Sequence, residues 1–473
     1  MTEVRTRFSP SPTGMIHLGN ARAALFSALF ASKNNGHFIL RIEDTDAVRS
    51  EDKYVDSLKS DLHWLGVYWQ EGPDVGGNYG PYWQSQRQDI YNRYYEELEV
   101  KKLIYPCFCT DQELNLARKL QLSRGHAPRY SGTCLKLSEH DIQKKLSEGK
   151  KPAWRFKVPK DAVIEYEDAV KGPQKFESND IGDFIVRRAD GTAPFLYCNA
   201  IDDAMMKVSH ALRGEDHVAN TPRQILILRA LELTAPQYGH LSLIVGDDGA
   251  PLSKRHGSYS LNQLHEQGFL PIAIMNYLAR LGHTCDAHEL LPFELLSQHF
   301  YLDKLSRSPA RFDASQLMYW QKTAIQSMDD ATIWSWLGED MLSQVPENKR
   351  QLFVHTVRAN IEFPYDALEW AKIFFHELVH LDAEESSIVR ASGEQFFVAA
   401  EQAVDSYGID VNKITAEMKS TLGVSGKKLF MPLRIALTGR MHGPELIHVA
   451  ELLGKDKMKH RFGAAFKLAS INQ

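Results

Sequence analysis

The first forty residues of the chain follow, in order, patterns typical of a strand, a loop, a helix and a second strand. Residues 4–8 alternate small or apolar side chains with arginine, which indicates a short strand. Prolines and a glycine then disfavour helix until about Asn20, a plausible N-cap, and helical spacing continues to Gly36. Residues 38–42 are apolar on both faces apart from Arg41, as in a strand buried inside a parallel sheet. This unit predicts an open α/β sheet, in which ligands bind beyond the carboxyl ends of the strands.

The loop of this unit, residues 10–20, reads PSPTGMIHLGN and has the chemistry of an anion site. A helix that begins just after Gly19 presents unpaired backbone N–H groups and the positive end of its dipole, both of which favour a bound anion. Because Gly19 has no side chain, a phosphate can approach the backbone closely, and His17 adds a side-chain donor.

A second string, APLSKRHG at residues 250–257, places Ser253, Lys254 and Arg255 in succession. A loop this rich in donors can close on a triphosphate, where cationic groups stabilise the charge that develops on the phosphorus and the departing pyrophosphate. The two strings are far apart in the sequence, so we expect folding to bring them together around one nucleotide.

With four further blocks, these strings resemble the class I aminoacyl-tRNA synthetases and, among them, the bacterial-type glutamyl-tRNA synthetases. The blocks are RFSPSPTG, FILRIEDTD, ALRGEDHVANTPRQ and LFMPLRIALTG, and the similarity extends from about Arg5 to about Leu453. The resemblance implies an enzyme that activates L-glutamate with ATP and Mg²⁺ and transfers it to the 3′ end of tRNA(Glu). It leaves open whether tRNA(Gln) is charged as well.

The resemblance also implies a fold class, α/β, in which a Rossmann-like parallel-sheet catalytic domain is split by an α+β insertion and followed by an all-helical anticodon-binding region. Its five expected segments are the first half of the Rossmann domain (1–83), the acceptor-stem-binding insertion (84–193), the second half of the Rossmann domain (194–245), the phosphate loop and stem-contact region (246–325) and the helical anticodon-binding region (326–473). Within the first segment, Ser50 is a candidate N-cap for a helix that Gly66 ends.

Composition sets limits on the partners and the compartment. A chain of 473 residues is too long for one compact core, and its net charge of −5 gives no global footprint for nucleic acid. Contact with tRNA must therefore use local patches. Five cysteines, no signal-like start and no apolar run near the roughly 20 residues that span a bilayer indicate a cytoplasmic protein, which we expect to be a monomer by resemblance.

A glutamate pocket must hold two carboxylates and one ammonium, so it needs at least two cations and an acidic group. Arginine suits the carboxylates because its planar guanidinium binds them in a bidentate manner. By resemblance, Arg7 and Arg213 fill the two cationic positions and Glu43 meets the amine. The resemblance assigns the whole pocket to Arg7, Ser9, Glu43, Phe195, Asn199 and Arg213.

Phe195 is a departure from the family, because most relatives carry there a tyrosine whose hydroxyl touches the substrate. Either Tyr197 compensates or the selectivity for the substrate side chain is altered.

The resemblance assigns ATP binding to both strings. It implies that His17 and Lys254 stabilise the departing pyrophosphate together with Mg²⁺, and that no protein nucleophile is required. Pro251 departs from the family, in which a lysine often opens this loop. The ATP-binding residues implied are Pro10, Thr13, Gly14, His17, Gly19, Asn20, Ser253, Lys254 and Arg255.

Three of the cysteines have the arrangement of a zinc site in some relatives. Cys107 and Cys109 form a CFC string, and Cys134 follows. Structural zinc takes four ligands, but Lys136 stands where some relatives have a histidine. Tyr130 resembles the fourth ligand of a shorter cousin family, so the implied set is Cys107, Cys109, Tyr130 and Cys134; His126 and His140 are alternatives. Cys198 and Cys285 are expected to be core residues.

Other interpretations stay open. A glutaminyl-tRNA synthetase shares the signatures but usually has a β-barrel anticodon region, and a tRNA-modifying glutamyl transferase lacks anticodon domains. A small adenylyltransferase fold with a helical protein-binding module is the third alternative. Arg434 and Arg440 are either a solvated face or tRNA contacts, and Asp44 is interpreted as a helix cap.

Overall fold

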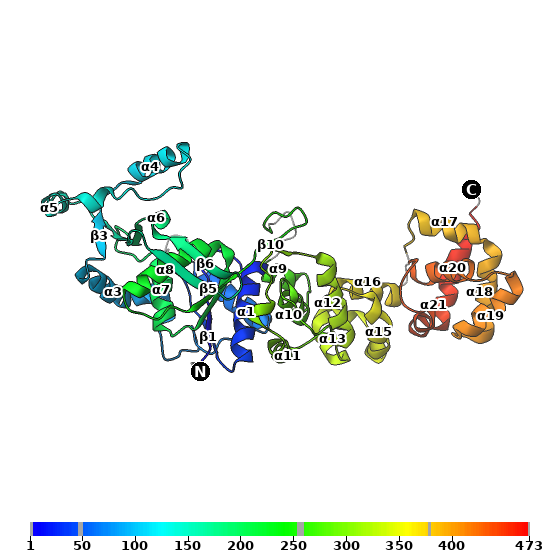
Figure 1. The fold of residues 1–473 in the computed structure, drawn as a ribbon. Helices are drawn as coiled ribbons and strands as arrows, with labels where there is room; N and C mark the ends of the chain where they lie inside the picture. Colours follow the sequence, from blue (N-terminus) through cyan, green and yellow to red (C-terminus); the bar gives the residue numbers. More distant parts are fainter. Residues whose placement is uncertain (1–2, 46–50, 253–259, 377–379, 472–473) are drawn as a thin grey trace. The chain divides into compact units, whose positions relative to one another are not determined.

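The computed structural model describes residues 3–45, 51–252, 260–376 and 380–471 (Figure 1). The chain divides into two compact units. Unit 1 comprises residues 1–266 and 271–316, and unit 2 comprises residues 267–270 and 317–473. Ser50, the predicted cap, and Ser253, Lys254 and Arg255 of the second string lie outside the described residues.

A parallel four-stranded sheet organises unit 1. Its spatial order is β2-β1-β8-β9, and every neighbouring pair is parallel. Two βαβ units build it and meet at the adjacent central strands β1 and β8, as in doubly wound sheets. The elements are β1 (Arg5–Phe8), α1 (Leu18–Lys33), β2 (His37–Leu40), β8 (His210–Gly214), α8 (Thr221–Ala230) and β9 (Gln237–Leu241).

The register of this sheet decides which side chains meet. Arg7 pairs with Ile39 on β2, and Arg213 of β8 pairs with His240 of β9. Because paired residues in a sheet point to the same face and alternate along each strand, Arg7, Arg213 and His240 share one face. Helix α1 packs against the sheet from the other face, where Thr6 donates a hydrogen bond to the backbone oxygen of Ser27.

The prediction that Asn20 caps the first helix is wrong. Helix α1 begins at Leu18, and the N-cap is His17, whose side chain makes no capping hydrogen bond. Burial explains the earlier start, because Leu18 is only 1% exposed and anchors the first turn in the core. The next helix, α2 (Asp52–Trp64), has Glu51 rather than Ser50 at its N-cap, and its end before Gly66 agrees with the prediction.

The insertion between the two halves of the sheet is mixed α and β. A three-stranded antiparallel sheet has the order β3-β4-β7, and β5 and β6 form a hairpin. Helices α4 and α5, drawn in cyan in Figure 1, bury no residue and are held by capping boxes from Thr110 and Ser138. The elements are α3 (Gln88–Val100), β3 (Ile104–Cys107), α4 (Asp111–Ser123), α5 (Glu139–Ser147), β4 (Ala153–Phe156), β5 (Val163–Asp168), β6 (Gly172–Glu177), α6 (Ser178–Ile181) and β7 (Phe184–Arg187).

One hydrophobic core joins this insertion to the parallel sheet. Its buried residues come from α3, β4, β5 and β7 of the insertion, from α8, and from α7 (Phe195–Met205). Ala211 of β8 and Tyr238 of β9 belong to the same core. The insertion therefore packs on the sheet face that carries Arg7, Arg213 and His240.

Unit 1 ends with a short two-stranded parallel sheet and four helices. The elements are β10 (Ile244–Val245), α9 (Leu261–Glu266), α10 (Pro271–Arg280), α11 (Phe293–Gln298), β11 (Ala310–Arg311) and α12 (Ala314–Ser327), which carries the boundary between the units.

Unit 2 is helical throughout its described residues, as predicted for the C-terminal region. The last helix is interrupted at Gly454, which has a positive φ of 75°. Its helices are α13 (Asp330–Leu337), α14 (Glu339–Gln344), α15 (Arg350–Val357), α16 (Pro364–Phe375), α17 (Ala383–Ser392), α18 (Glu394–Tyr407), α19 (Val411–Leu422), α20 (Lys427–Thr438) and α21 (Leu446–Ala469). Among the described residues, no helix of the protein combines the length and apolar character that crossing a membrane requires.

Candidate active site

A cavity of about 440 Å³ opens beyond the carboxyl ends of β1 and β8. Residues from the end of β1 and its loop, the start of α1, the segment after β2, helix α7, and the ends of β8 and β9 with the segments after them line it. Of the predicted site residues, the lining includes Arg7, Ser9, Pro10, Thr13, Gly19, Asn20, Glu43, Phe195, Asn199 and Arg213. The residues assigned to glutamate and most of those assigned to the first ATP string therefore lie around one cavity.

Arg213 is a buried cation that contacts no acidic side chain in the part of the chain that the structure describes. Its Nε lies 3.2 Å from His240 Nε2, and its Nη2 donates to Thr221 Oγ1 at 2.7 Å. Its Nη1 is buried and has no hydrogen-bond partner among the described residues. Burial lowers the pKa of Arg213 to about 10, so the group is still charged at neutral pH. An unpaired buried donor of this kind is costly unless an anion accepts from it.

Arg7, in contrast, is partly neutralised. Its Nε lies 3.2 Å from Asp203 Oδ1, and its Nη1 donates to the backbone oxygen of Leu212 at 3.1 Å. The buried Asp203 also pairs with Arg41 Nη1 at 2.8 Å. Asp203 thus holds two arginine side chains side by side, and their charges lower its pKa although burial opposes this.

Asn199 connects the acidic group of the site to this cluster. Its Nδ2 donates to Glu43 Oε1 at 3.2 Å, while its Oδ1 accepts from Arg41 Nη2 at 2.8 Å. Ser9 Oγ accepts from Arg41 Nε at 3.1 Å. Glu43 is only 5% exposed, and this burial raises its pKa to about 8 against the opposing charge of Arg41. A cation bound next to Glu43 would therefore favour loss of its proton.

The side chain of Phe195 lies at the cavity and stacks on His217, with ring centroids 5.0 Å apart. Tyr197 does not compensate for the missing hydroxyl at Phe195. It is fully buried, its hydroxyl donates to the backbone oxygen of Tyr91 at 3.1 Å, and its ring stacks on Tyr95. Helical geometry explains this, because residues two positions apart on a helix point in different directions.

The glycines of the first ATP string face open space. Among the described residues, a Cβ atom added at Gly14 or Gly19 would meet no heavy atom within 4 Å beyond the adjacent backbone, and neither residue has a positive φ. Neither packing nor backbone conformation therefore requires glycine at these two positions, and the space beside Gly19 belongs to the cavity.

His17 is exposed and forms an antiparallel β-bridge with Ser260. The backbone N–H of Leu261 donates to the oxygen of Ile16 at 3.1 Å. The chain therefore returns from the second string directly beside the first. The string's own donors, including Lys254, are outside the described residues.

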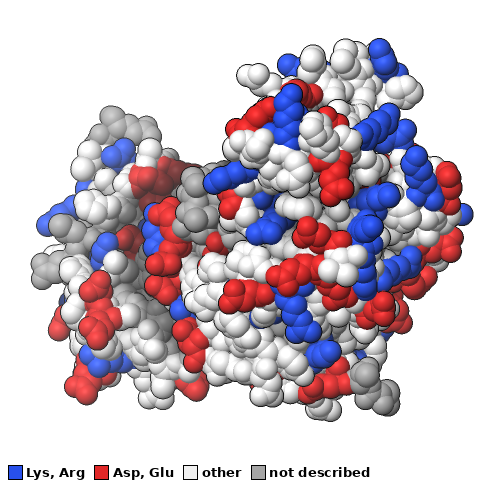
Figure 2. Space-filling view, turned by 90° about the vertical axis from the view of Figure 1, so that its left-hand side faces the viewer, with Lys and Arg blue, Asp and Glu red and all other residues white. Residues whose placement is uncertain are grey.

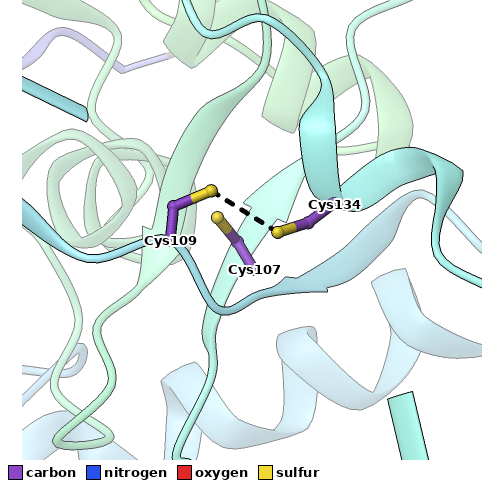
Figure 3. Close-up of side chains that lie close together, drawn as sticks. All are labelled: Cys107, Cys109 and Cys134. Atoms are coloured by element: carbon purple, nitrogen blue, oxygen red, sulfur yellow. Dashed lines mark hydrogen bonds between the residues drawn. The ribbon is translucent and has the colours of Figure 1, made fainter. Parts of the chain in front are cut away.

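The three cysteines among the four predicted zinc ligands come together (Figure 3). The sulfur atoms of Cys107, Cys109 and Cys134 all lie within 4.8 Å of one another, and those of Cys109 and Cys134 are 3.5 Å apart. Tyr130 Oη lies 3.4 Å from the sulfurs of both Cys107 and Cys109. Within the described ranges, the alternatives His126 and His140 are not part of this group.

Arg155 contacts Cys107 of this cysteine cluster and the neighbouring Tyr130. Its Nε lies 3.2 Å from the sulfur of Cys107, and its guanidinium lies 3.7 Å from the centre of the Tyr130 ring. Burial opposes ionisation of Cys107, but hydrogen bonds from Tyr130 and Arg155 outweigh it and lower the pKa of the thiol. Of the other cysteines, Cys198 is buried as predicted, whereas Cys285 is only half-buried.

Two family models cover almost the whole chain. The model for the catalytic domain of class I tRNA synthetases (E and Q) matches residues 3–319, and an anticodon binding domain model matches residues 326–466. The chain belongs to the class I tRNA synthetases. The predicted family and fold class are confirmed.

Curated relatives of this synthetase are similar along their full length. It is 50% identical to glutamate–tRNA ligase 2 of Coxiella burnetii over 462 residues, which are 98% of this chain and 99% of the relative. It is 52% identical to glutamate–tRNA ligase 2 of Nitrosococcus oceani over 460 residues, 97% of this chain and 98% of the relative.

A crystal structure of a glutamate tRNA ligase from Elizabethkingia meningosepticum in complex with its amino acid has a similar fold. It superposes with a TM-score of 0.88 at 30% identity and covers 98% of this synthetase and 99% of that chain. A glutamate–tRNA synthetase structure from Elizabethkingia anophelis also has a TM-score of 0.88 at 30% identity, over 98% of this synthetase and 100% of that chain.

Several residues that organise the site of this synthetase were not singled out in the sequence. Two signals could have found some of them. Arg41 interrupts the apolar run at residues 38–42, and the adjacent Asp202 and Asp203 interrupt an apolar helix; buried charges in such places need partners. No comparable signal marks His240 or Thr221.

Arg434, which had two interpretations, donates to the backbone oxygen of Pro444 at 2.5 Å. Burial lowers its pKa. This contact favours a structural role for Arg434, whereas Arg440 is exposed. Asp44 accepts from the backbone N–H of Ser85 at 2.8 Å and so binds the start of a 3₁₀ turn at Gln84–Arg87, not a following helix as expected.

Proposed function

We propose that this synthetase is a glutamate–tRNA ligase in which the cavity beyond β1 and β8 binds glutamate and the α-phosphate of ATP. The observation that carries the assignment is Arg213, which lines the cavity and whose buried Nη1 has no partner among the described residues. A substrate carboxylate supplies the missing acceptor. Arg7 is the second cation of the cavity, and Glu43 is the group that meets the ammonium.

The first step forms glutamyl adenylate. The α-carboxylate of glutamate attacks the α-phosphorus of ATP in line, the bond to the bridging oxygen of the β-phosphate breaks, and pyrophosphate leaves. Glutamate is held by Arg213, Arg7 and Glu43, so the protein contributes mainly position and charge. His17 and Lys254 stabilise the leaving pyrophosphate, and Mg²⁺, which ATP brings with it, adds to this charge stabilisation.

The second step transfers the glutamyl group. A ribose hydroxyl at the 3′ end of tRNA, by family resemblance the 2′-OH, attacks the carbonyl carbon of the adenylate, and AMP leaves. The 3′ end must therefore reach the same cavity.

A basic groove in the insertion supports contact with the acceptor end of tRNA. The groove has a volume of about 910 Å³, and Asp183 is the acidic residue in its lining. On the face drawn in Figure 2, Asp and Glu lie among most of the Lys and Arg, and several Lys and Arg gather on the right-hand side of the view. A local basic groove is a suitable site for phosphates. The basic residues that line it include Lys101, Lys102, Arg129, Lys136, Lys157, Lys160 and Arg229.

We also propose that the cysteine cluster binds structural zinc with Tyr130 as the fourth ligand. Tetrahedral zinc with Zn–S bonds of about 2.3 Å separates its sulfurs by about 3.8 Å, close to the 3.5 Å between Cys109 and Cys134. The position of Tyr130 Oη, 3.4 Å from two of the sulfurs, also suits a shared ion. The positive charge of Arg155 would offset part of the excess negative charge of three thiolates and a phenolate.

Pyrophosphate exchange tests the proposed reaction. Purified protein should exchange labelled pyrophosphate into ATP with glutamate and not with glutamine, and added tRNA should strengthen the exchange. Exchange driven by glutamine, or none with any amino acid, would reject the proposal.

Charging of purified tRNA(Glu) and tRNA(Gln) side by side then defines the acceptor range.

Size-exclusion chromatography with light scattering tests the prediction of a monomer.

A further inference from the structure

A hydrogen-bonded chain leads from the insertion hairpin to Arg213. It begins at Asp168, the last residue of β5, which is 2% exposed. One carboxylate oxygen, Oδ2, accepts from Nδ1 of the fully buried His240. The other, Oδ1, accepts from three backbone N–H groups: Lys171 at 2.8 Å, Val170 at 2.9 Å and His240 at 3.2 Å. Asp168 is therefore fixed by the backbone and offers one oxygen to the imidazole.

This arrangement determines the tautomer of His240. An ionised carboxylate only accepts hydrogen bonds, so Nδ1 of His240 carries the proton and Nε2 is left as an acceptor. Burial and the charge of Arg213 lower the pKa of His240 against the opposing bond to Asp168, which keeps the ring neutral. The Nε2 lone pair then accepts from Arg213 Nε at 3.2 Å.

Two further contacts hold the guanidinium of Arg213 in place. Thr221 Oγ1 accepts from Arg213 Nη2 and is itself 3.0 Å from His240 Nε2. The ring of Tyr238 lies under the guanidinium, whose carbon is 5.0 Å from the ring centre. These contacts hold Nε and Nη2, so the guanidinium of Arg213 has one orientation. Its Nη1 is then the donor left for a ligand.

We propose that Asp168 and His240 are positioning residues that set the affinity for the substrate carboxylate by orienting Arg213. This inference rests on the proposed function of Arg213. Neither residue touches the substrate, and each acts through the next. Asp168 selects the Nδ1–H tautomer of His240, and the Nε2 atom of that tautomer orients Arg213.

The substitution Asp168→Asn should select the other tautomer of His240, in which Nε2 carries the proton. The three backbone donors keep the amide oxygen at the position of Oδ1, so the amide nitrogen replaces Oδ2 and directs an N–H at Nδ1. The imidazole must then carry its proton on Nε2, where it faces the Nε–H of Arg213. The loss of one charged hydrogen bond predicts a KM for glutamate raised roughly 10- to 100-fold in pyrophosphate exchange, with little change in kcat or in the KM for ATP.

Variants at His240 separate orientation from folding. In His240→Gln, the amide oxygen can replace Nε2 as the acceptor, so this variant should preserve most of the affinity for glutamate. In His240→Met, the side chain has similar bulk but no comparable acceptor, so this variant should lose affinity for glutamate. Adding Asp168→Asn to His240→Gln should cost little, because no tautomer remains to be selected. A purely structural role of Asp168 would produce the same loss in both backgrounds and would overturn the proposal.

The matched control is Asp190→Asn. Asp190 is a carboxylate of the same insertion that accepts from the backbone N–H of Thr192 at 2.9 Å and from the hydroxyl of the same residue at 2.6 Å. It has no described link to Arg213, so its replacement should leave the KM for glutamate unchanged.

A measurement on the unmodified protein keeps the proposal falsifiable if the variants fold poorly. Nitrogen NMR of histidine-labelled protein should show a buried neutral ring protonated on Nδ1, assigned to His240 by its absence from His240→Gln. An Nε2–H tautomer would overturn the proposal. If Arg213→Ala leaves the KM for glutamate unchanged, the proposed function of Arg213 is wrong. If Arg213→Ala raises this KM but Asp168→Asn and His240→Met do not, only the positioning role is wrong.

Discussion

His17 and Ser260 are joined by an antiparallel β-bridge, although they lie in opposite parts of the catalytic region. A second contact runs from the backbone N–H of Leu252 to the oxygen of Ile244 at 2.9 Å. The chain is therefore attached to described parts of unit 1 at Leu252 and again at Ser260, which lies directly beside the first ATP string. This attachment is the structural basis for expecting Lys254 to act at the same nucleotide as His17.

Lys254→Ala should slow adenylate formation by roughly 10²- to 10³-fold, because it removes a cationic donor from the departing pyrophosphate. The melting temperature and the KM for glutamate should change little. Rapid-quench measurement of adenylate formation checks this. Near-normal turnover would reject the role of Lys254.

Gly19→Ala should raise the KM for ATP by about tenfold or more, because the added methyl group occupies cavity space beside the helix start. The fold should tolerate the change, since no described atom apart from the adjacent backbone lies within 4 Å of the new Cβ. Gly463→Ala in α21 is the control, because its Cβ would also meet no atom. Both variants should melt at or above the temperature of the unmodified protein, and an unchanged KM for ATP in Gly19→Ala would contradict the assignment.

Arg213→Ala should raise the KM for glutamate far more than it lowers kcat. Arg213→Lys should recover only part of the affinity, since a lysine cannot reach His240, Thr221 and a substrate carboxylate at once with a planar fork. Steady-state exchange at varied glutamate measures this. Equal KM values for the alanine variant and the unmodified protein would count against the site.

The affinity for glutamate should rise with pH. Glu43 has its pKa raised to about 8 by burial, so it is largely protonated at neutral pH and becomes a better partner for the substrate ammonium as it ionises. The KM for glutamate should therefore fall between about pH 7 and pH 9, by at most about tenfold per unit. His217, whose pKa burial lowers to about 4, stays neutral over this range.

Glu43→Gln is the matching variant for this pH profile. It should bind glutamate weakly and without the pH dependence, because the glutamine cannot ionise. A profile that persists unchanged in Glu43→Gln would assign the dependence to another group.

Cys134→Ser should reduce the zinc content measured by plasma mass spectrometry and lower the melting temperature, because structural zinc stabilises the fold that binds it. Tyr130→Phe should weaken zinc retention against a chelator. Cys285→Ser, outside the cluster, should change neither property. Zinc-free protein with unaltered stability would contradict the proposed metal site.

Local patterns in the sequence were sufficient to predict the first βαβ unit and its position at the ligand edge of a sheet. Alternation over residues 4–8 and the apolar run at 38–42 became β1 and β2. Helix α1 begins before the position that capping preference predicts, because the buried Leu18 anchors its first turn. The five-segment division of the chain stays a prediction.

Contacts between remote residues account for most of what the sequence could not predict. From the sequence alone, Phe195 and Tyr197 are equally suitable as pocket residues. The helical geometry of α7 directs Tyr197 toward Tyr95 instead. The contact of Asp168 with His240 joins a hairpin of the insertion to the parallel sheet. Nothing in the local pattern around either residue indicates that pairing.

The position of Asp168 at the end of β5 has a consequence for the evolution of this enzyme. One carboxylate of the segment inserted between the two halves of the nucleotide-binding fold contacts His240, which in turn contacts the arginine proposed to bind the amino acid. Exchanging the insertion for that of a distant homologue would accordingly alter discrimination between free amino acids, even in an assay from which nucleic acid is omitted.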